Sequence, residues 1–280
     1  LAQASGFYQI IEGCYCLFAL NGNGLTMLLP PLGEPSRQER ALRICLKIMD
    51  LYNPSPAQAR LDFVYQDFLK VVDTDLLSGA PLINGELWHV EVTNPDYIYR
   101  TQDLIELKGN SYKTKRNEIN QFRRAHPNHT LVPFSRAHEV EARTLVNTWM
   151  QNRLRTIPDG PVEEFLYNLE MERKAIQRAI TLYDELKLEG LSLFIDGKLE
   201  GFTFGERLNR DVANVLIEKT NFNIQGAAQY LFREFSKVFA DCTYINVGDD
   251  LGFENLRRVK MSYRPAMFGE KIILRRLLPE

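Results

Sequence analysis

The chain has 280 residues, of which 45% are apolar and 25% charged, and its formal net charge is −2. This is the composition of a folded globular protein, whose length allows one hydrophobic core or two. The near-neutral charge excludes a global attraction to nucleic acid or anionic membranes, so any such contact needs a local patch. The sequence has no apolar run of the roughly 20 residues that span a membrane, and no cationic segment followed by an apolar one opens it. We therefore expect a cytoplasmic protein.

The cysteines indicate a reducing compartment rather than a disulfide framework or a metal site. Cys14 and Cys16 lie two residues apart, where a strand places them on one face, and the other two are isolated. This spacing matches neither a C-x-x-C redox motif nor a zinc site, and His126 with His129 alone is too sparse to hold a metal. We expect buried free thiols, no metal site and no permanently bound cofactor.

The first 107 residues alternate strands and helices. Turn residues at 21–24 separate two apolar runs, and Ser36 with Glu39 three residues later is typical of a helix N-terminus. Apolar residues then recur at helical spacing until Asn53. We predict strands at 7–20, 25–29, 61–65, 87–92 and 97–100, a helix at 36–53 and a short helix at 66–72. The resulting order is β-β-α-β-α-β-β.

Residues 108–128 are predicted to form a basic connector helix, and residues 129–280 a second domain. The Asp196-Gly197 turn joins two of its strands into a hairpin. The predicted order, β-α-α-β-β-β-α-β-α-β, indicates a mixed, mostly antiparallel sheet flanked by helices. Its back half repeats the order of residues 1–107. We therefore predict a mixed α/β (α+β) protein of two tandem domains, the first lacking its leading strand and two helices.

Several short strings in the chain carry a family resemblance. They are Asp103-Leu104 to Lys108-Gly109, Tyr112 to Arg116-Asn117, Ala175-Ile176, Gly205-Glu206-Arg207-Leu208, and Asp250-Leu251-Gly252 to Leu256-Arg257 with Lys260, Ser262 and Tyr263. With the element order, they resemble the soluble relatives of the C-terminal domain of phosphatidylglycerol lysyltransferases, which have a tandem GNAT-like acyltransferase fold. The resemblance implies transfer of an acyl group from CoA, or of an aminoacyl group from charged tRNA. The membrane portion of those enzymes is absent from this sequence, so we expect a soluble amine or hydroxyl acceptor, either a small molecule or a peptide.

The resemblance also implies a donor-binding loop in the second domain. In the GNAT fold, backbone N–H groups at a helix N-terminus bind pyrophosphate, and small residues allow the close approach. Gly226 and Ala228 fit this pattern, whereas Asn223 replaces the usual Gln or Arg. An ordinary helix start is the alternative explanation. The candidate donor-binding residues are Asn223, Gln225, Gly226, Ala227 and Ala228, with Asn246 at the end of the next strand.

The corresponding loop of the first domain spans residues 30–35 and has different chemistry. Pro35 removes an N–H donor, and the carboxylate of Glu34 would repel phosphate. We therefore predict that the first domain does not bind CoA.

Three residues are candidates for catalysis. Hairpin register places Glu218 just before the candidate loop and Glu206 beside the opposite turn, so Glu218 is the candidate general base. An exposed carboxylate paired with a lysine is the alternative. Glu172 falls on the apolar stripe of its helix, where it forms a structural salt bridge or contacts a substrate amine. The resemblance makes Tyr263 the candidate acid for the departing thiolate, and a packed tyrosine is the alternative.

The predicted connector helix has a basic face. Lys113, Arg116, Asn120 and Arg124 recur at three- and four-residue spacing, and Arg257 belongs to a second basic cluster. Such a face can hold the phosphates of tRNA, a phospholipid headgroup or a nucleotide, and the alternative is a solvated helix face. We predict a transferase with tRNA as a candidate partner. The rival hypothesis is a non-catalytic binding or regulatory protein on a degenerate acyltransferase scaffold.

Overall fold

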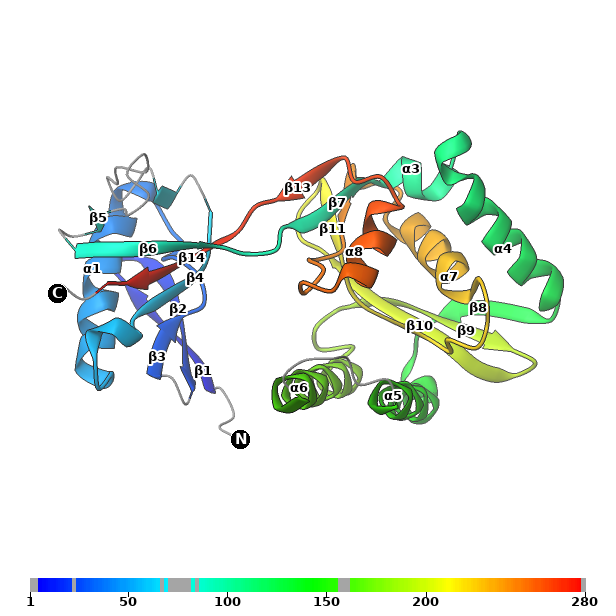
Figure 1. Ribbon diagram of the computed structural model, residues 1–280, viewed down its shortest axis with the longest axis horizontal. Coiled ribbons are helices and arrows are strands. Elements are labelled where there is room, and N and C mark those ends of the chain that lie inside the picture. Colours follow the sequence, from blue (N-terminus) through cyan, green and yellow to red (C-terminus); the bar gives the residue numbers. More distant parts are fainter. Residues whose placement is uncertain are drawn as a thin grey trace. The chain divides into compact units, whose positions relative to one another are not determined.

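The computed structural model describes residues 5–21, 24–65, 68–69, 82–83, 86–155 and 162–277, and it divides into two compact units (Figure 1). Unit 1 comprises Leu1–Pro95 and Gly269–Glu280, and unit 2 comprises Asp96–Phe268. Each unit has its own mixed sheet flanked by helices. Within the described ranges, no helix is both long enough and apolar enough to cross a membrane.

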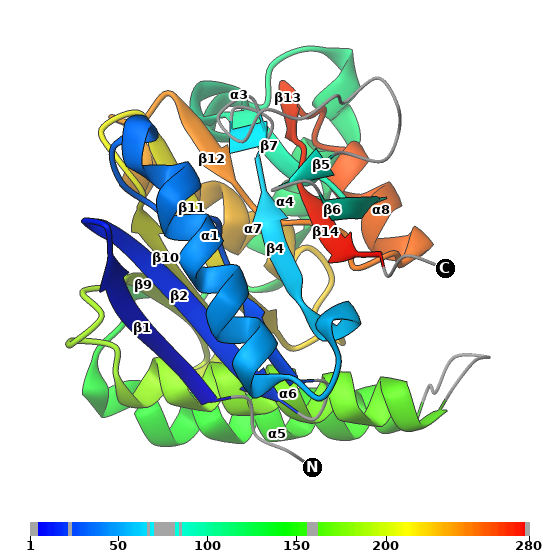
Figure 2. The ribbon, with the colours of Figure 1, turned by 90° about the vertical axis from the view of Figure 1, so that its left-hand side faces the viewer.

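The sheet of unit 1 has the strand order β1-β2-β3-β4-β14-β6-β5. Helix α1 (Pro35–Tyr52) covers one face of it (Figure 2), and its apolar stripe of Leu42, Cys45 and Met49 is buried against the strands. The four cysteines of the chain are free and buried, as predicted. The strands are β1 (Ser5–Ile11), β2 (Cys14–Asn21), β3 (Gly24–Met27), β4 (Arg60–Val64), β5 (Leu82–Ile83), β6 (Glu86–Val92) and β14 (Ile272–Arg276).

The sheet of unit 2 has the strand order β13-β7-β12-β11-β10-β9-β8. Its strands are β7 (Asp96–Arg100), β8 (His129–Pro133), β9 (Glu189–Ile195), β10 (Lys198–Arg207), β11 (Val212–Thr220), β12 (Tyr244–Asn246) and β13 (Met267–Gly269). Its helices are α3 (Thr101–Glu106), α4 (Lys113–Ala125), α5 (Glu139–Leu154), α6 (Val162–Thr181), α7 (Ala227–Ser236) and α8 (Glu254–Met261).

Unit 2 has a separate hydrophobic core on each face of its sheet. Helices α4 and α7 pack on one face, where Phe122 and Phe235 belong to the same buried cluster. Helices α5 and α6 pack on the other, where Val146 and Ile176 meet Phe202 and its neighbours (Figure 1). The buried aliphatic and aromatic side chains of β10, Leu199, Phe202 and Phe204, all belong to the second of these cores, whereas its Gly201 and Gly205 lie against α7 on the other face.

The two units share a β-β-β-α-β repeat. In unit 1 it is β1-β2-β3-α1-β4, and in unit 2 it is β9-β10-β11-α7-β12. In both, the strand before the helix pairs parallel with the strand after it. Strand β8 and helices α5 and α6 have no counterpart in the described part of unit 1. This arrangement confirms the predicted fold class of two tandem GNAT-like domains.

The boundaries between the two units differ from the predicted ones. The strand expected to close the first domain, β7, pairs with β12 of unit 2, and the last strand, β14, lies between β4 and β6 of unit 1. The predicted connector helix is α4 of unit 2, where it packs on α7. Periodicity along the chain identifies a strand but not the sheet that it joins, which is why the boundaries at 107, 128 and 280 differ.

Two local predictions also differ from the structure. The strand expected at 7–20 is a hairpin, because Glu12 and Gly13 both have positive φ, as a tight two-residue turn requires. Helix α1 begins at Pro35 and its N-cap is Glu34, two residues before the expected N-cap Ser36. The short helix expected at 66–72 falls mostly outside the described residues.

Candidate active site

A cavity of about 300 Å³ lies in unit 2 at the point where β11 and β12 separate. The two strands pair parallel only from Val212 to Asn214, and β11 then continues beside β10 alone. The cavity is lined by residues 215–218 of β11, the first turns of α7, Tyr99 of β7, Val247 just after β12, helix α8 and Tyr263. The separation of the strands therefore creates a space that reaches the N-terminal turn of a helix.

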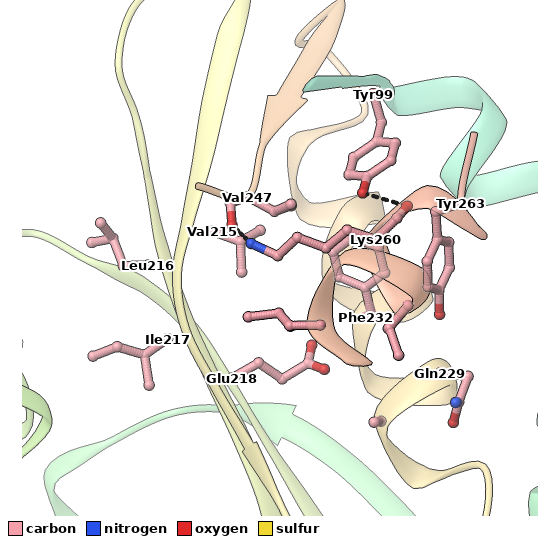
Figure 3. Close-up of a pocket in the computed structure, with 13 residues that line it drawn as sticks. Tyr99, Val215, Leu216, Ile217, Glu218, Gln229, Phe232, Val247, Lys260 and Tyr263 are labelled. Carbon is pink, nitrogen blue, oxygen red and sulfur yellow. Dashed lines mark hydrogen bonds between the residues drawn. The ribbon is translucent and has the colours of Figure 1, made fainter. Parts of the chain in front are cut away.

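Glu218 carries the carboxyl group of this cavity (Figure 3). The residue is partly exposed, but its Oε2 atom is inaccessible to solvent and has no hydrogen-bond partner among the described residues. Burial raises the pKa of Glu218 to about 8, against a smaller opposing effect of the neighbouring Lys219 ammonium. At neutral pH the group is therefore mostly protonated, and it becomes a base as the pH approaches 8.

Tyr263 lines the same cavity. Its side chain is buried, and its backbone oxygen accepts a 3.0 Å hydrogen bond from the hydroxyl of Tyr112. Burial and the nearby carboxyl of Glu218 hold the pKa of Tyr263 well above its ordinary value. Its hydroxyl therefore stays protonated at neutral pH and is able to donate a proton or a hydrogen bond.

Lys260 borders the cavity with its aliphatic stem. Its ammonium group donates to the backbone oxygens of Val247 at 2.7 Å, Gly248 at 3.1 Å and Asp249. Its own backbone oxygen accepts a 2.8 Å hydrogen bond from the hydroxyl of Tyr99. Lys260 thus holds the loop after β12 in place, and its positive charge is directed at that loop.

The predicted donor-binding loop reaches the cavity only at its end. Ala228 lines the cavity with Gln229, and Gly226 is the N-cap of α7 with a φ of 81°. A Cβ atom at Gly226 would clash with the backbone oxygen of Glu118 and lie 2.9 Å from Cβ of Phe122. The glycine is therefore required by the packing of α4. Asn223, Gln225 and Ala227 do not line the cavity.

Two further candidates lie outside the cavity. Glu172 is exposed rather than buried on an apolar stripe, and it forms a 2.7 Å salt bridge with Lys219. The structural salt bridge that was one of the two predicted readings of Glu172 is therefore present, whereas its burial on the apolar stripe is not, because the carboxylate stays open to water beside the lysine of β11. Asn246 donates to Asp96 Oδ2 at 3.0 Å and accepts from the N–H of Gly248 at 2.7 Å. Both side chains thus have structural partners.

The predicted basic face is only partly available. Arg116 donates to the backbone oxygens of Leu107 and Gly109, where it caps the end of α3. Arg257 forms a 2.9 Å salt bridge with the buried Asp250, which lowers the pKa of Asp250 to about 2. The members of the face that remain exposed are Lys113, Asn120 and Arg124.

Lys115, which is not among the predicted residues of the basic face, is buried in the structure. Its Nζ atom lies 4.5 Å from the centroid of the Tyr263 ring and 3.7 Å from Glu118 Oε2. The signal was present in the sequence, because Lys115 lies four and seven residues before Ile119 and Phe122, the apolar positions of α4. Helix α4 thereby brings a charged pair up to the cavity tyrosine.

This repeat, with a cavity where its parallel strands separate, defines a protein with a tandem GNAT-like, acyltransferase-type fold. The chain belongs to the family described as phosphatidylglycerol lysyltransferase, C-terminal, which it matches over residues 2–275.

Solved structures and a curated relative resemble this chain over most of its length. It is similar to a conserved protein of unknown function from Bacteroides thetaiotaomicron, with 26% identity, a TM-score of 0.80, and coverage of 96% of this chain and 85% of that one. It is also similar in fold to L-PGS from Bacillus licheniformis, with 15% identity, a TM-score of 0.68, and coverage of 99% and 85%. An uncharacterised protein of Mycoplasmoides gallisepticum is 24% identical over 217 residues, which are 75% of this chain and 66% of that protein. The chain thus spans slightly less than two thirds of that relative.

Proposed function

We propose that unit 2 transfers an acyl or aminoacyl group from an activated donor to an amine or hydroxyl acceptor. The observation that carries this proposal is the carboxyl group of Glu218, whose Oε2 atom has no partner inside the cavity beside α7. A buried carboxyl with a pKa of about 8 is suited to general-base work near neutral pH. Membership of a lysyltransferase family supports the same class of reaction.

The proposed reaction is a direct attack of the acceptor on the donor carbonyl. The acceptor nitrogen or oxygen forms a bond to the carbonyl carbon, and ionised Glu218 takes the proton that the nucleophile loses. The thioester C–S bond or the ester C–O bond to tRNA then breaks. Tyr263, 8% exposed and protonated, gives its proton to the departing sulfur or oxygen. Glu218 then returns its proton to Tyr263, so both groups regain their starting protonation states and no net proton or electron is consumed.

The donor is proposed to be acyl-CoA or aminoacyl-tRNA, which share a polyanionic carrier. The first turn of α7 offers N–H groups without intrahelical partners at the cavity, at Ala228 and Gln229. The exposed cations Lys113 and Arg124 of α4 are the proposed contacts for more distant phosphates. Both donors occur in the cytoplasm, so we propose that the protein acts there on a small-molecule or peptide acceptor.

A donor panel tests the proposal. The melting temperature of the full chain is measured with acetyl-CoA, longer acyl-CoAs and aminoacyl-tRNA, since a ligand at 100 times its dissociation constant adds about 2.7 kcal/mol. We expect one donor class to stabilise the protein and to be consumed when an acceptor is added. No stabilisation by any donor would reject the transferase proposal. Lys113→Ala with Arg124→Ala should weaken binding of tRNA more than binding of CoA and reduce its salt dependence.

A second candidate function is non-catalytic binding on the same scaffold. It is favoured by Gly226, whose missing side chain is explained by its positive φ and by the packing of α4, and by the internal salt bridge of Arg257. In that case a donor analogue binds without turnover in wild type and Glu218→Gln alike. Turnover by wild type that Glu218→Gln lacks excludes this alternative.

A further inference from the structure

Lys115 of α4 is a buried cation beside the candidate acid Tyr263. Only 8% of the residue is exposed, although most lysines lie in water. Its Nζ atom lies 4.5 Å from the centroid of the Tyr263 ring, within the roughly 6 Å over which an aromatic face attracts an ammonium group. Figure 3 shows this ring in the cavity that also contains Glu218. The structure therefore holds a positive charge against the tyrosine of the site.

The ammonium group of Lys115 is only loosely paired with its counter-ion. Its Nζ atom lies 3.7 Å from Oε2 of Glu118, beyond hydrogen-bonding distance, and this oxygen has no hydrogen-bond partner among the described residues. A second lysine–glutamate pair with the same three-residue spacing, Glu234 and Lys237 at the end of α7, is 2.6 Å apart. The ammonium of Lys115 thus lies over the ring rather than in a close ion pair.

Packing alone does not explain a charge at this position of α4. Transfer of an ammonium group from water to a protein interior is unfavourable, and apolar residues of similar volume often stabilise a protein where they replace a buried ion pair. The other buried residues of α4 are Ile119 and Phe122, so a methionine in place of Lys115 would fit the same face. The charge is better explained by its effect on Tyr263.

Tyr263 needs a nearby cation in order to act as an acid. Burial raises the pKa of its hydroxyl well above the ordinary value, and Glu218, Glu118 and Tyr99 add to the shift. So weak an acid transfers its proton poorly, because general acids work best when their pKa lies near the working pH. A positive charge beside the ring favours the ionised form and opposes these effects.

We propose that Lys115 is a positioning residue that acts through Tyr263. Its ammonium group stabilises the negative charge that the ring carries after the hydroxyl has given its proton to the leaving group. The inference rests on the proposed function and deepens it by adding a residue to the same site. In this step the O–H bond of Tyr263 breaks, and the proton bonds to the departing sulfur or oxygen. The phenolate stays beside Lys115 until Glu218 returns a proton to it.

The other charged groups near the Tyr263 ring cannot supply this stabilisation. Glu218 of β11 and Glu118 of α4 are acids, whose negative charge disfavours a phenolate. Lys260 of α8 directs its ammonium at three backbone oxygens of the loop after β12. In the described part of the chain, Lys115 is the cation that lies over this ring.

A fluorinated tyrosine makes the coupling measurable in the full chain without any donor. Tyr263 is replaced by difluorotyrosine through stop-codon suppression, because fluorine makes the phenol a stronger acid that ionises where the protein is folded. Fluorine NMR then follows the ionisation of this residue alone. Lys115→Met should raise the midpoint by about one pH unit, which is a tenfold weaker acid, and Lys115→Arg should keep it near that of wild type.

Two further variants provide the sign and the control. Glu118→Gln should lower the midpoint, because it removes a negative charge from the surroundings of the same ring. Lys237→Met removes an ammonium group from the second lysine–glutamate pair and should leave the midpoint unchanged. Lys115→Met keeps an unbranched apolar side chain, so a folded variant is expected, and its melting curve checks this.

The donor that stabilises the protein in the panel above tests the role of Lys115 in transfer. Lys115→Met should lower the turnover number about three- to tenfold with little change in the KM for the donor, because a weaker acid protonates the leaving group more slowly. In a Tyr263→Phe background the same substitution should have no further effect, since Lys115 acts through the hydroxyl.

Each result decides the question. An unchanged midpoint in Lys115→Met, or shifts of the same sign in Lys115→Met and Glu118→Gln, overturns the inference. An equal loss of turnover with and without the Tyr263 hydroxyl also overturns it. Turnover by wild type together with an unchanged midpoint rejects the role of Lys115 but keeps the proposed function. The expected midpoint shifts without turnover from any donor reject the proposed function instead, and with it any role of Lys115 in transfer.

Discussion

Helices α1 and α7 occupy the same place in the two β-β-β-α-β repeats, yet they begin with opposite chemistry. Helix α1 has Glu34 as its N-cap and Pro35 in its first turn, and Glu34 forms an exposed 3.3 Å salt bridge with Arg37. Helix α7 begins at Gly226 and Ala227, and its first turn borders the cavity of unit 2. The two repeats share a backbone topology. An anion at the start of α1 would meet the carboxylate of Glu34, and Pro35 offers it no N–H, whereas the small residues at the start of α7 allow an anion to approach the backbone.

The difference shows that two units with the same repeat of strands and helix can have different side chains beside the helix N-terminus. Unit 1 places thiols and aliphatic side chains beneath α1, with Cys16 of β2 and Met27 of β3 buried there. Unit 2 places a carboxyl group and aromatic rings beside α7. Fold alone therefore leaves the function open, and the side chains beside each helix start decide it.

The largest effect is expected from Glu218→Gln. If Glu218 is the base of unit 2, the substitution lowers turnover by about 10²- to 10⁴-fold while donor binding stays nearly unchanged. In wild type the rate should rise with pH up to about 8 and then level off, because the base form of Glu218 accumulates over that range. Steady-state kinetics from pH 6 to 9 measure both. Turnover retained in Glu218→Gln, or a flat profile, removes Glu218 from the base role.

Gly226→Ala tests whether α4 determines the start of α7. The substitution combines a positive φ with a clash against the backbone of α4, so we expect it to lower the free energy of unfolding by about 2–4 kcal/mol. Gly197→Ala is the matched control, because Gly197 has the same φ of 81° but nothing within 4 Å of an added Cβ. Urea denaturation measures both. Equal losses would mean that the clash contributes nothing.

Much of the fold could be predicted because its local signals agree. The Asp196-Gly197 turn marked the β9–β10 hairpin, and helical spacing marked α5 and α7 within a few residues. The exchange of β7 and β14 could not be predicted, since strand pairing is decided by long-range packing. The hairpin at Glu12-Gly13 was missed because a single glycine interrupts an otherwise apolar run.

The candidate site was predictable to a similar degree. Register along β11 predicted that Glu218 lies near the helix start, and in the structure Glu218, Tyr263 and Ala228 of the first turn of α7 line one cavity. The apolar spacing of α6 predicted a buried position for Glu172, which is exposed in the structure. Such spacing does not show where a neighbouring strand ends or whether it places a lysine beside the helix. The packing of Tyr99, Phe232 and Tyr263 on one another beside the cavity was not predictable, since the three rings come from distant segments.

The pH dependence of stability separates two buried carboxyl groups of unit 2. The pKa of Glu218 is raised from 4.5 to about 8, so the folded state binds more protons than the unfolded state between these values. Stability from this group is present below pH 4.5 and is lost as pH rises to 8. The free energy of unfolding of Glu218→Gln, relative to that of wild type, should therefore rise by up to about 1.4 kcal/mol per pH unit between pH 4.5 and 8. Above pH 8 the difference should stay constant. Thermal melts of wild type and Glu218→Gln from pH 4 to 9 measure this difference in stability. A difference that does not change with pH would contradict the prediction.

The same experiment should show a pH dependence of stability with the opposite sign for Asp250, because its pKa is lowered rather than raised. Its pKa is lowered from 3.8 to about 2, first because Arg257 donates to its carboxylate, and also because Tyr97 donates to it at 2.6 Å. The stability that it contributes is complete above pH 3.8 and is lost as pH falls toward 2. Asp250→Asn should therefore be destabilising at pH 7 and lose most of that difference at pH 2. A difference that stays constant with pH would assign the effect to packing.

The smallest effect is expected in unit 1, where Glu34→Gln with Pro35→Ala removes the acid and restores an N–H at the start of α1. The exposed Glu34–Arg37 pair contributes little, so the free energy of unfolding should change by less than about 1 kcal/mol. Donor-induced stabilisation should also stay as in wild type, because the described residues of unit 1 have no counterpart of the cavity carboxyl group of Glu218 in unit 2. Calorimetric titration with acyl-CoA measures the number of sites. A second site in the variant would show that two residues at a helix start are all that separates the repeats.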